Sequence, residues 1–205
     1  MVIYSMVPLI DPRPVTLEGR HVRLEPLSLA HQDRLCAVGL DAELWRWAQT
    51  TLATPADMRA YIETALTWQA QGTALPFAIV ARATGQVVGS TRYANIERAD
   101  RRLEIGWTWI ARTAQRTPVN TEAKYLLLGH AFEVLGCNRV EFKTDVLNER
   151  SRAALLRIGA KQEGVLRSHM ITATGRVRDS VYFSIVAAEW PAVKVALEQK
   201  LARPA

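Results

Sequence analysis

Cysteine and histidine are scarce in this 205-residue chain, which contains two cysteines and four histidines. Cys36 and Cys137 stand about a hundred positions apart, and neither has a second cysteine or histidine at the short spacing of metal ligands. This scarcity excludes a disulfide framework and a zinc site. We therefore expect no metal cofactor, and two unpaired thiols in a reducing cytoplasm.

Long apolar segments are also missing. The N-terminal stretch from Met1 to Ile10 carries no basic residue and is interrupted by Asp11, Pro12 and Pro14. This stretch is too short to cross a bilayer, and a signal peptide needs a positively charged start. We therefore expect neither a signal peptide nor a membrane span.

The chain has no internal repeat, no low-complexity tract and no linker rich in glycine and serine. Its composition, 49% hydrophobic and 22% charged, is typical of a globular protein with a core of its own. These features predict one domain over residues 15–190, preceded by an N-terminal extension over residues 1–14. A C-terminal helix and tail are expected over residues 191–205.

The charge of the chain is unbalanced, with 26 lysines and arginines against 20 aspartates and glutamates and a net charge of +6. A positive excess favours either nucleic acid or a polyanionic small molecule as the partner. The arginines are scattered, without the basic strand interleaved with aromatic residues that binds single-stranded nucleic acid. We therefore expect no direct nucleic-acid binding.

Hydrophobic periodicity predicts a chain of strands and helices. Strands are expected over residues 20–27, 77–82, 86–94, 103–109, 138–146, 162–171 and 178–188. Helices are expected over residues 28–38, 54–72, 120–135, 148–159 and 191–201. This order predicts an α/β (α+β) fold with a mixed, mostly antiparallel central sheet of about seven strands, flanked by about four helices.

The most informative stretch is Trp109 to Lys124, where a strand ends, a basic loop follows and a helix begins. The first N–H groups of a helix have no partner within the helix, and the N-terminus carries partial positive charge, so that it can bind phosphate. Arg112 and Arg116 add formal charge beside it. The pattern predicts a pyrophosphate site.

Several short motifs follow this loop in a fixed order. They are Glu122-Ala123, His130-Ala131-Phe132-Glu133, Asn138-Arg139-Val140, Asn148-Glu149-Arg150-Ser151, Gly159-Ala160 and Glu163-Gly164-Val165-Leu166-Arg167. In these motifs the sequence resembles the GNAT-superfamily N-acetyltransferases, in the branch similar to the ribosomal-protein N-terminal (RimJ/RimL-like) acetyltransferases. The resemblance runs from about Val15 to Trp190. It implies a GNAT-like sheet, an acyl-CoA N-acyltransferase domain over residues 15–190 and acetyl-CoA as the cosubstrate.

The phosphate loop departs from the pattern of the family. Most members carry Q/R-x-x-G-x-G/A, whereas this chain has Pro118 and Asn120 where glycine and then glycine or alanine would stand. Proline has no N–H group, so one expected phosphate contact is missing. Pro118 suits the first turn of a helix, and we expect Arg116 or the Asn120 side chain to compensate.

The resemblance also implies how acetyl-CoA is held. The strand before the loop would pair with the pantetheine arm through Ile110 and Ala111, and Asn148 would hold the pantetheine with Ser151 near the thiol. An alternative reading of Asn148 is a helix cap alone. The full set implied for acetyl-CoA is Trp109, Ile110, Ala111, Arg112, Gln115, Arg116, Thr117, Val119, Asn120, Thr121, Asn148, Ser151 and Arg152.

Transfer from a thioester to an amine requires a neutral amine and a proton for the departing thiolate. By analogy with the family, Glu104 is the carboxylate expected to take the proton of the amine. The alternative is an exposed strand residue paired with an arginine among residues 98–102. Ser151 is the expected acid and Tyr182 the second choice, and backbone N–H groups near Ile110 would polarise the thioester carbonyl.

The acceptor is expected on the side opposite the CoA nucleotide. Trp45 and Trp47 lie in a segment that is unusually apolar for a loop between helices, although core packing is an alternative for at least one of them. His169, Arg178 and Asp179 on the last two strands are further candidates for binding the acceptor.

The resemblance implies the α-amine of a protein N-terminus as the favoured acceptor. With a pKa near 8, an α-amine has less need of a general base than a lysine amine near 10.4. A small-molecule amine acetyltransferase, a catalytically silent CoA-binding protein and a basic RNA-associated module are the alternatives. The resemblance further implies a homodimer through the late strands. We expect no membrane association.

Overall fold

The computed structural model describes residues 9–203. The expectation that residues 1–10 form no signal peptide therefore falls mostly outside the described range. Within that range eight strands form one sheet in the order β1-β2-β3-β4-β5-β6-β8-β7. All neighbouring strands are antiparallel except β5 and β6, which are parallel. The strands are β1 (Leu17–Glu18), β2 (Val22–Pro26), β3 (Leu75–Ala81), β4 (Gln86–Glu97), β5 (Arg102–Ile110), β6 (Arg139–Asp145), β7 (Lys161–Ile171) and β8 (Val177–Val186).

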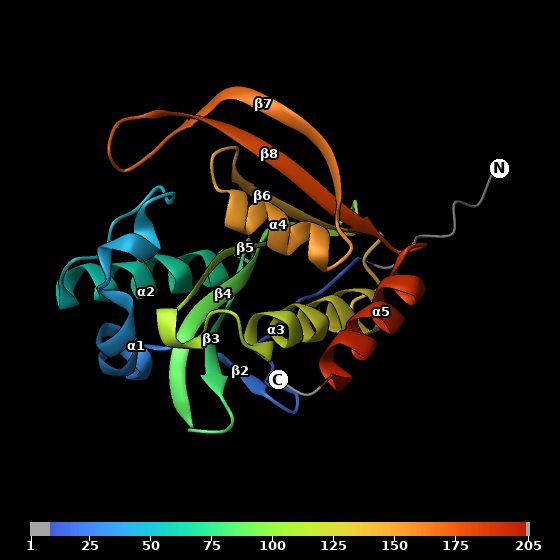
Figure 1. Ribbon diagram of the computed structural model, residues 1–205, viewed down its shortest axis with the longest axis horizontal. Helices are drawn as coiled ribbons and strands as arrows, with labels where there is room; N and C mark the ends of the chain where they lie inside the picture. Colours follow the sequence, from blue (N-terminus) through green and yellow to red (C-terminus); the bar gives the residue numbers. More distant parts are fainter. Residues whose placement is uncertain (1–8, 204–205) are drawn as a thin grey trace.

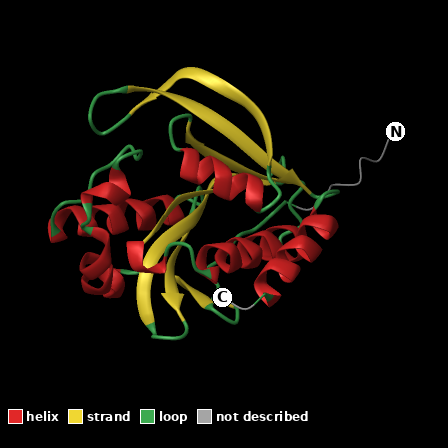
Figure 2. Ribbon diagram, in the orientation of Figure 1, coloured by secondary structure: helices red, strands yellow, loops and turns green. Residues whose placement is uncertain are grey.

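The helices cover both faces of the sheet (Figures 1 and 2). They are α1 (Gln32–Gly39), α2 (Pro55–Ala70), α3 (Pro118–Gly129), α4 (Glu149–Arg157) and α5 (Trp190–Ala202), and a π-helical turn, His130–Val134, extends α3. None of the helices within residues 9–203 has the length and apolar character needed to span a membrane. The predicted fold class is confirmed, with eight strands instead of about seven and with five α-helices, the C-terminal α5 included. The added strand, β1, has two residues, too few to show a hydrophobic period.

Two hydrophobic cores lie on opposite faces of the sheet. The first core contains Phe77 and Phe142 of the sheet and Leu127 of α3, together with Leu197 of α5. The second core lies between α1, α2 and the sheet and contains Met58. Because α5 contributes to the first core, it packs as part of the same unit as α3. The domain boundaries expected at residues 15 and 190 stay predictions.

The caps of α2 and α4 lie where the sequence predicted them, whereas α3 begins at Pro118, before the expected start at residue 120. Thr54 and Asp57 form a reciprocal capping box at the start of α2, with Pro55 at the first helical position. Asn148 accepts the N–H of Ser151 at the start of α4. Gly159 follows α4 with φ +92°, a conformation that glycine adopts without a steric penalty.

A β-bulge in β5 changes the faces that its side chains occupy. The pairing with β4 shifts between Ser90 and Arg92, and Trp107 has φ +49°. Leu103 therefore lies in the first core and Trp109 in the second. An uninterrupted alternation over residues 103–109 would place both residues on one side, but one extra residue in a strand moves all later side chains to the other face.

Candidate active site

The sheet opens between its two central strands. β5 and β6 are paired only from Arg102 to Glu104, although β5 continues to Ile110 and β6 to Asp145. β4 stays paired with β5 up to Ile110, so the two halves of the sheet separate beyond Glu104. In the described part of the chain, no strand pairs with this free edge of β5. Its backbone groups are therefore available to an extended ligand.

The backbone contacts at the end of β5 decide which groups face this edge. The N–H of Ala111 donates to the carbonyl of Val88 on β4 at 2.7 Å. Because successive residues of a strand direct their N–H groups to opposite edges, the N–H of Ile110 faces the opening. The carbonyl of Ile110 already accepts a hydrogen bond from Gln115 Nε2 at 2.9 Å. Ile110 thus keeps a free donor. Ala111 was expected to pair with the pantetheine arm as well, but its N–H is already bonded to β4.

The free edge of β5 leads into the loop before α3. Thr117 caps α3, and its hydroxyl accepts the N–H of Val119 at 3.3 Å. Pro118 occupies the first helical position, as its ring geometry predicted. Asn120 is consequently the next residue of the first turn that can offer a backbone N–H to an anion. Arg116 has φ +62°, the left-handed region that favours glycine.

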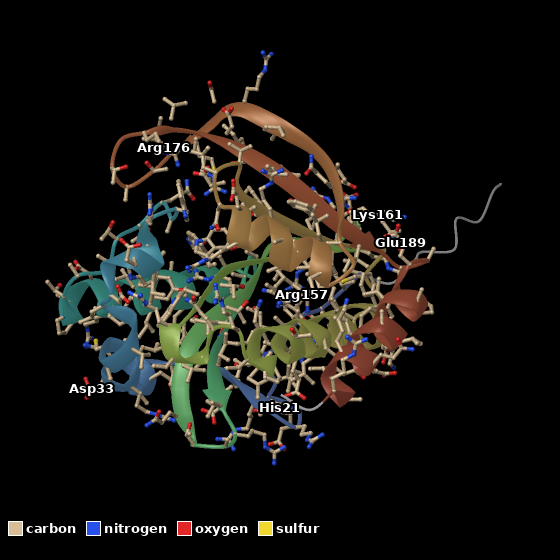
Figure 3. The ribbon with its side chains drawn as sticks, viewed as in Figure 1. His21, Asp33, Arg157, Lys161, Arg176 and Glu189 are labelled. Atoms are coloured by element: carbon tan, nitrogen blue, oxygen red, sulfur yellow. The ribbon has the colours of Figure 1, made fainter. Side chains whose placement is uncertain are left out.

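Arginines of α4 add positive charge next to this loop. Arg150 Nη1 lies 3.4 Å from Gln115 Oε1, and Arg157 Nη2 lies 3.5 Å from Thr121 Oγ1 on α3. Figure 3 shows Arg157 between α4 and α3. The residues expected from α4 were Asn148, Ser151 and Arg152, and neither Arg150 nor Arg157 was among them. Cations from two different elements therefore flank the start of α3.

The remaining residues expected to bind acetyl-CoA have other contacts. The Trp109 indole is buried in the second core, and the Val119 side chain is buried in the first. Arg112 lies 3.7 Å from Asp41, and Arg152 Nη1 donates to the carbonyl of Val146 at 3.1 Å. The side chains of Trp109 and Val119 are thus core residues, and only their backbones remain available to a ligand.

Glu104 lies on β5 at the point where the sheet opens. Its side chain is 3% exposed, accepts a hydrogen bond from Asn95 Nδ2 at 2.8 Å and lies 3.4 Å from Lys143 Nζ on β6. Gly106 leaves room for this carboxylate, because a Cβ there would lie 2.7 Å from Oε1. The alternative of an exposed residue paired with a neighbouring arginine is therefore wrong.

Tyr182 and His169 lie beside Glu104 and Lys143. The two rings are 5.8 Å apart, and Lys143 Nζ lies 5.8 Å from the centroid of Tyr182. Burial raises the pKa of Tyr182, and the charge of Glu104 raises it further, so the phenol keeps its proton at neutral pH. Burial, followed by the charges of Lys143 and Arg178, lowers the pKa of His169. Both groups are therefore neutral and close to the buried carboxylate.

The end of the β7–β8 hairpin reaches the segment between α1 and α2. Arg176 pairs with the buried Asp145 and lies 5.7 Å from the ring centroid of Trp47 (Figure 3). Arg178 is buried, with Nε 4.0 Å from Asp145. Trp47 and Arg178 are thus linked through Arg176 and Asp145.

Two of the expected acceptor residues have structural contacts instead. Trp45 is buried in the second core, where its Nε1 donates to the carbonyl of Gly39 at 2.7 Å. Asp179 accepts the N–H of Ser168 at 2.7 Å, at a residue of β7 with φ +50°. Their polar groups thus serve the core and the hairpin, respectively.

Lys124 on α3 was not expected to lie near the site. Its side chain is 5% exposed, and Nζ donates to Thr108 Oγ1 at 2.6 Å. The Thr108 hydroxyl is in turn 2.7 Å from that of Thr91. Burial lowers the pKa of Lys124 to about 7. The sequence carried no signal for this contact, since nothing local distinguishes Lys124 from an exposed helical lysine.

Known proteins share this architecture. A Bacillus subtilis (strain 168) protein named as a ribosomal N-acetyltransferase, YdaF, is 36% identical over 110 residues, which cover 54% of this chain and 59% of YdaF. A GCN5-related N-acetyltransferase from Brucella melitensis has a TM-score of 0.89 and 35% identity, covering 98% of this chain and 91% of that one. Mycobacterium smegmatis RimJ in complex with CoA-disulfide has a TM-score of 0.81 and 24% identity, covering 91% of this chain and 95% of that one.

The match to YdaF spans less than two thirds of that relative. The pattern of the acetyltransferase (GNAT) domain family, however, matches residues 21–161. This range is more than half of the 205 residues and contains the opening between β5 and β6, the loop and α4. The resemblance seen in the sequence is confirmed, and the chain belongs to the GNAT acetyltransferase family.

Proposed function

We propose that this chain transfers the acetyl group of acetyl-CoA to a primary amine, with the α-amine of a protein N-terminus as the favoured acceptor. The observation that carries the proposal is the free edge of β5, which ends at the cationic start of α3. Acetyl-CoA has a matching chemistry, with an amide-containing arm that can pair with a strand edge and a pyrophosphate that suits a helix N-terminus. The fold that this chain shares with M. smegmatis RimJ, whose structure contains CoA-disulfide, supports a CoA compound as the ligand.

In this proposal the N–H of Ile110 pairs with the pantetheine arm. Arg116 and Arg150 neutralise the pyrophosphate, and the backbone of Asn120 donates to it in place of the N–H that Pro118 lacks. The support for this compensation is that α3 begins at Pro118 with an intact cap, so the departure from the family loop has not displaced the helix. Asn148 and Ser151 at the start of α4 complete the set.

The proposed chemistry is a direct transfer. The nitrogen of the amine attacks the carbonyl carbon of the thioester, so that a C–N bond forms and the C–S bond breaks. Glu104 takes the proton released by the amine, and the departing thiolate takes a proton from a protein hydroxyl. The products are an amide and CoA with a free thiol.

Two hydroxyl groups are candidates for that proton donor. Ser151 on α4 is favoured by the family resemblance, and Tyr182 is favoured by its position next to Lys143 and near Glu104. Because burial raises the pKa of Tyr182, the phenol is protonated when a thiolate leaves at neutral pH.

A small-molecule amine as the acceptor and a catalytically silent CoA-binding protein are the competing functions. The buried Glu104 supports an active enzyme, since a silent protein has no need to keep a carboxylate that is 3% exposed. A homodimer through β7 and β8 and a cytoplasmic location stay predictions.

Calorimetric titration with acetyl-CoA tests the proposal, with desulfo-CoA and ATP as controls. We expect micromolar binding of acetyl-CoA and much weaker binding of ATP, followed by acetylation of peptide or small-amine acceptors detected by thiol release. Absence of acetyl-CoA binding would contradict the proposal. Binding without turnover of any acceptor would favour the silent protein.

A further inference from the structure

Arg92 of β4 is a buried cation without a matching anion. Its side chain is 1% exposed, and among residues 9–203 its Nε and Nη2 have no hydrogen-bond partner. None of the ion pairs formed by the described residues includes it. An unpaired buried charge is strongly unfavourable, so its presence needs a compensating group.

Aromatic rings surround this guanidinium. Its Cζ lies 4.9 Å from the ring centroid of Tyr61 and 5.3 Å from those of Trp68 and Trp107. Cation–π contacts offset part of the cost of burial but do not accept the in-plane N–H groups. Nε and Nη2 form the edge of a guanidinium that binds a carboxylate through two parallel hydrogen bonds.

Arg92 lies close to the proposed base. Its neighbour in the sheet is Gly106, and Ala94, two residues along β4, is the neighbour of Glu104. The Trp107 ring links Arg92 to the surroundings of Glu104. Besides Arg92, it contacts Lys143, the partner of Glu104, whose Nζ lies 5.9 Å from the ring centroid. A small molecule whose amine faces Glu104 can therefore present a nearby group to Arg92.

Positive charge exceeds negative charge on this side of the opening. Lys143 is paired with Glu104, and Arg176 and Arg178 share Asp145. Arg178 Nε is also buried without a hydrogen-bond partner among residues 9–203. With Arg92, four cations face two carboxylates, so an anionic acceptor fits this surface and a polycationic one does not.

We propose that the acceptor amine carries a carboxylate close to its reactive nitrogen and that Arg92 binds this carboxylate. This inference rests on the proposed acetyltransferase function and adds the chemical class of the acceptor. Trp68 and Trp107 are only partly buried, and a turn of either ring opens the guanidinium to the ligand, a change of the kind that side chains commonly undergo on binding. The carboxylate comes either from a free amino acid or from an acidic residue next to a peptide N-terminus.

Matched acceptor pairs test the proposal and distinguish the two sources. L-serine is compared with L-serinamide, and the amidated peptide Ser-Asp-Ala with amidated Ser-Asn-Ala. For each pair the measured quantity is the ratio of kcat/KM, calculated for the neutral amine, of the carboxylate member to that of the amide member. We expect the carboxylate member of one pair to be favoured at least tenfold, and that pair identifies the source. Arg92→Met should bring the ratio near one, and Arg92→Lys should keep part of it. Arg59→Met, an exposed change on α2, serves as the control and should leave the ratio unaltered.

The outcomes distinguish a failure of the proposed role of Arg92 from a failure of the proposed acetyltransferase function. Equal rates for both members of both pairs would contradict the role of Arg92 while leaving the acetyltransferase intact. A retained preference in folded Arg92→Met would contradict it as well. If Arg92→Met fails to fold, the wild-type ratios and Arg92→Lys decide. Absence of acetyl-CoA binding would overturn the proposed function first.

Discussion

Replacing Lys124 by methionine should stabilise the protein, and most strongly at low pH. Burial lowers the pKa of this amine from 10.5 to about 7. At 1.36 kcal/mol per pH unit, this difference makes the charged amine about 5 kcal/mol less favourable in the folded chain than in the unfolded one. Methionine replaces the apolar stem of lysine without the charged end group, and the lost hydrogen bond to Thr108 reduces the gain by about 1 kcal/mol.

The pH dependence follows from the two protonation states. Between pH 7 and about 10.5 the unfolded chain binds a proton at Lys124 that the folded chain has released, so the stability of the wild type rises with pH. Below pH 7 the amine is charged in both states, and the penalty is complete. The advantage of Lys124→Met should therefore shrink by about 3 kcal/mol between pH 6 and pH 9.

Urea denaturation of both proteins at pH 6, 7, 8 and 9 measures this difference. All other titrating groups are shared, so their contributions cancel in the comparison. Lys161→Met, at an exposed lysine paired with Glu189 (Figure 3), is the control and should show no pH-dependent difference. If the difference in free energy of unfolding between Lys124→Met and the wild type stayed constant from pH 6 to pH 9, the claim that the buried Lys124 amine titrates near neutrality would be refuted.

Changes at three further positions test the proposed base, the phosphate site and a buried carboxylate. Glu104→Gln should lower kcat for acetyl transfer at least tenfold with unchanged CoA affinity, and wild-type turnover would remove Glu104 from the mechanism. Arg116→Ala and Arg116→Gly should both weaken CoA binding in calorimetry, and an unchanged dissociation constant would show that the phosphate site is misplaced. Only glycine relieves the left-handed backbone at this position, so Arg116→Gly should be more stable than Arg116→Ala by about 1 kcal/mol. Glu122→Gln should destabilise the fold by about 2 kcal/mol in urea, because the Glu122 carboxylate accepts the N–H groups of Arg20, His21 and Val22; unaltered stability would contradict this role.

Local sequence signals predicted the elements of this fold well. Runs of residues with high β propensity located β3 and β4, and cap residues such as Thr54 and Asn148 located helix starts. These signals act within a few residues, so they are visible without tertiary structure. The loop before α3 was placed for the same reason, since a strand end, basic residues and a helix start are contiguous in the chain.

The sequence by itself determined the order of the elements, the position of the loop before α3 and the family. The tertiary structure decided which charged groups lie together and which are buried. Glu104 meets Lys143 and Lys124 meets Thr108 across different elements, and the bulge at Trp107 moves Trp109 to the other core. The physical reason is that burial and pairing depend on residues far apart in the chain, and a single extra residue in a strand reverses its faces without leaving a periodic signal.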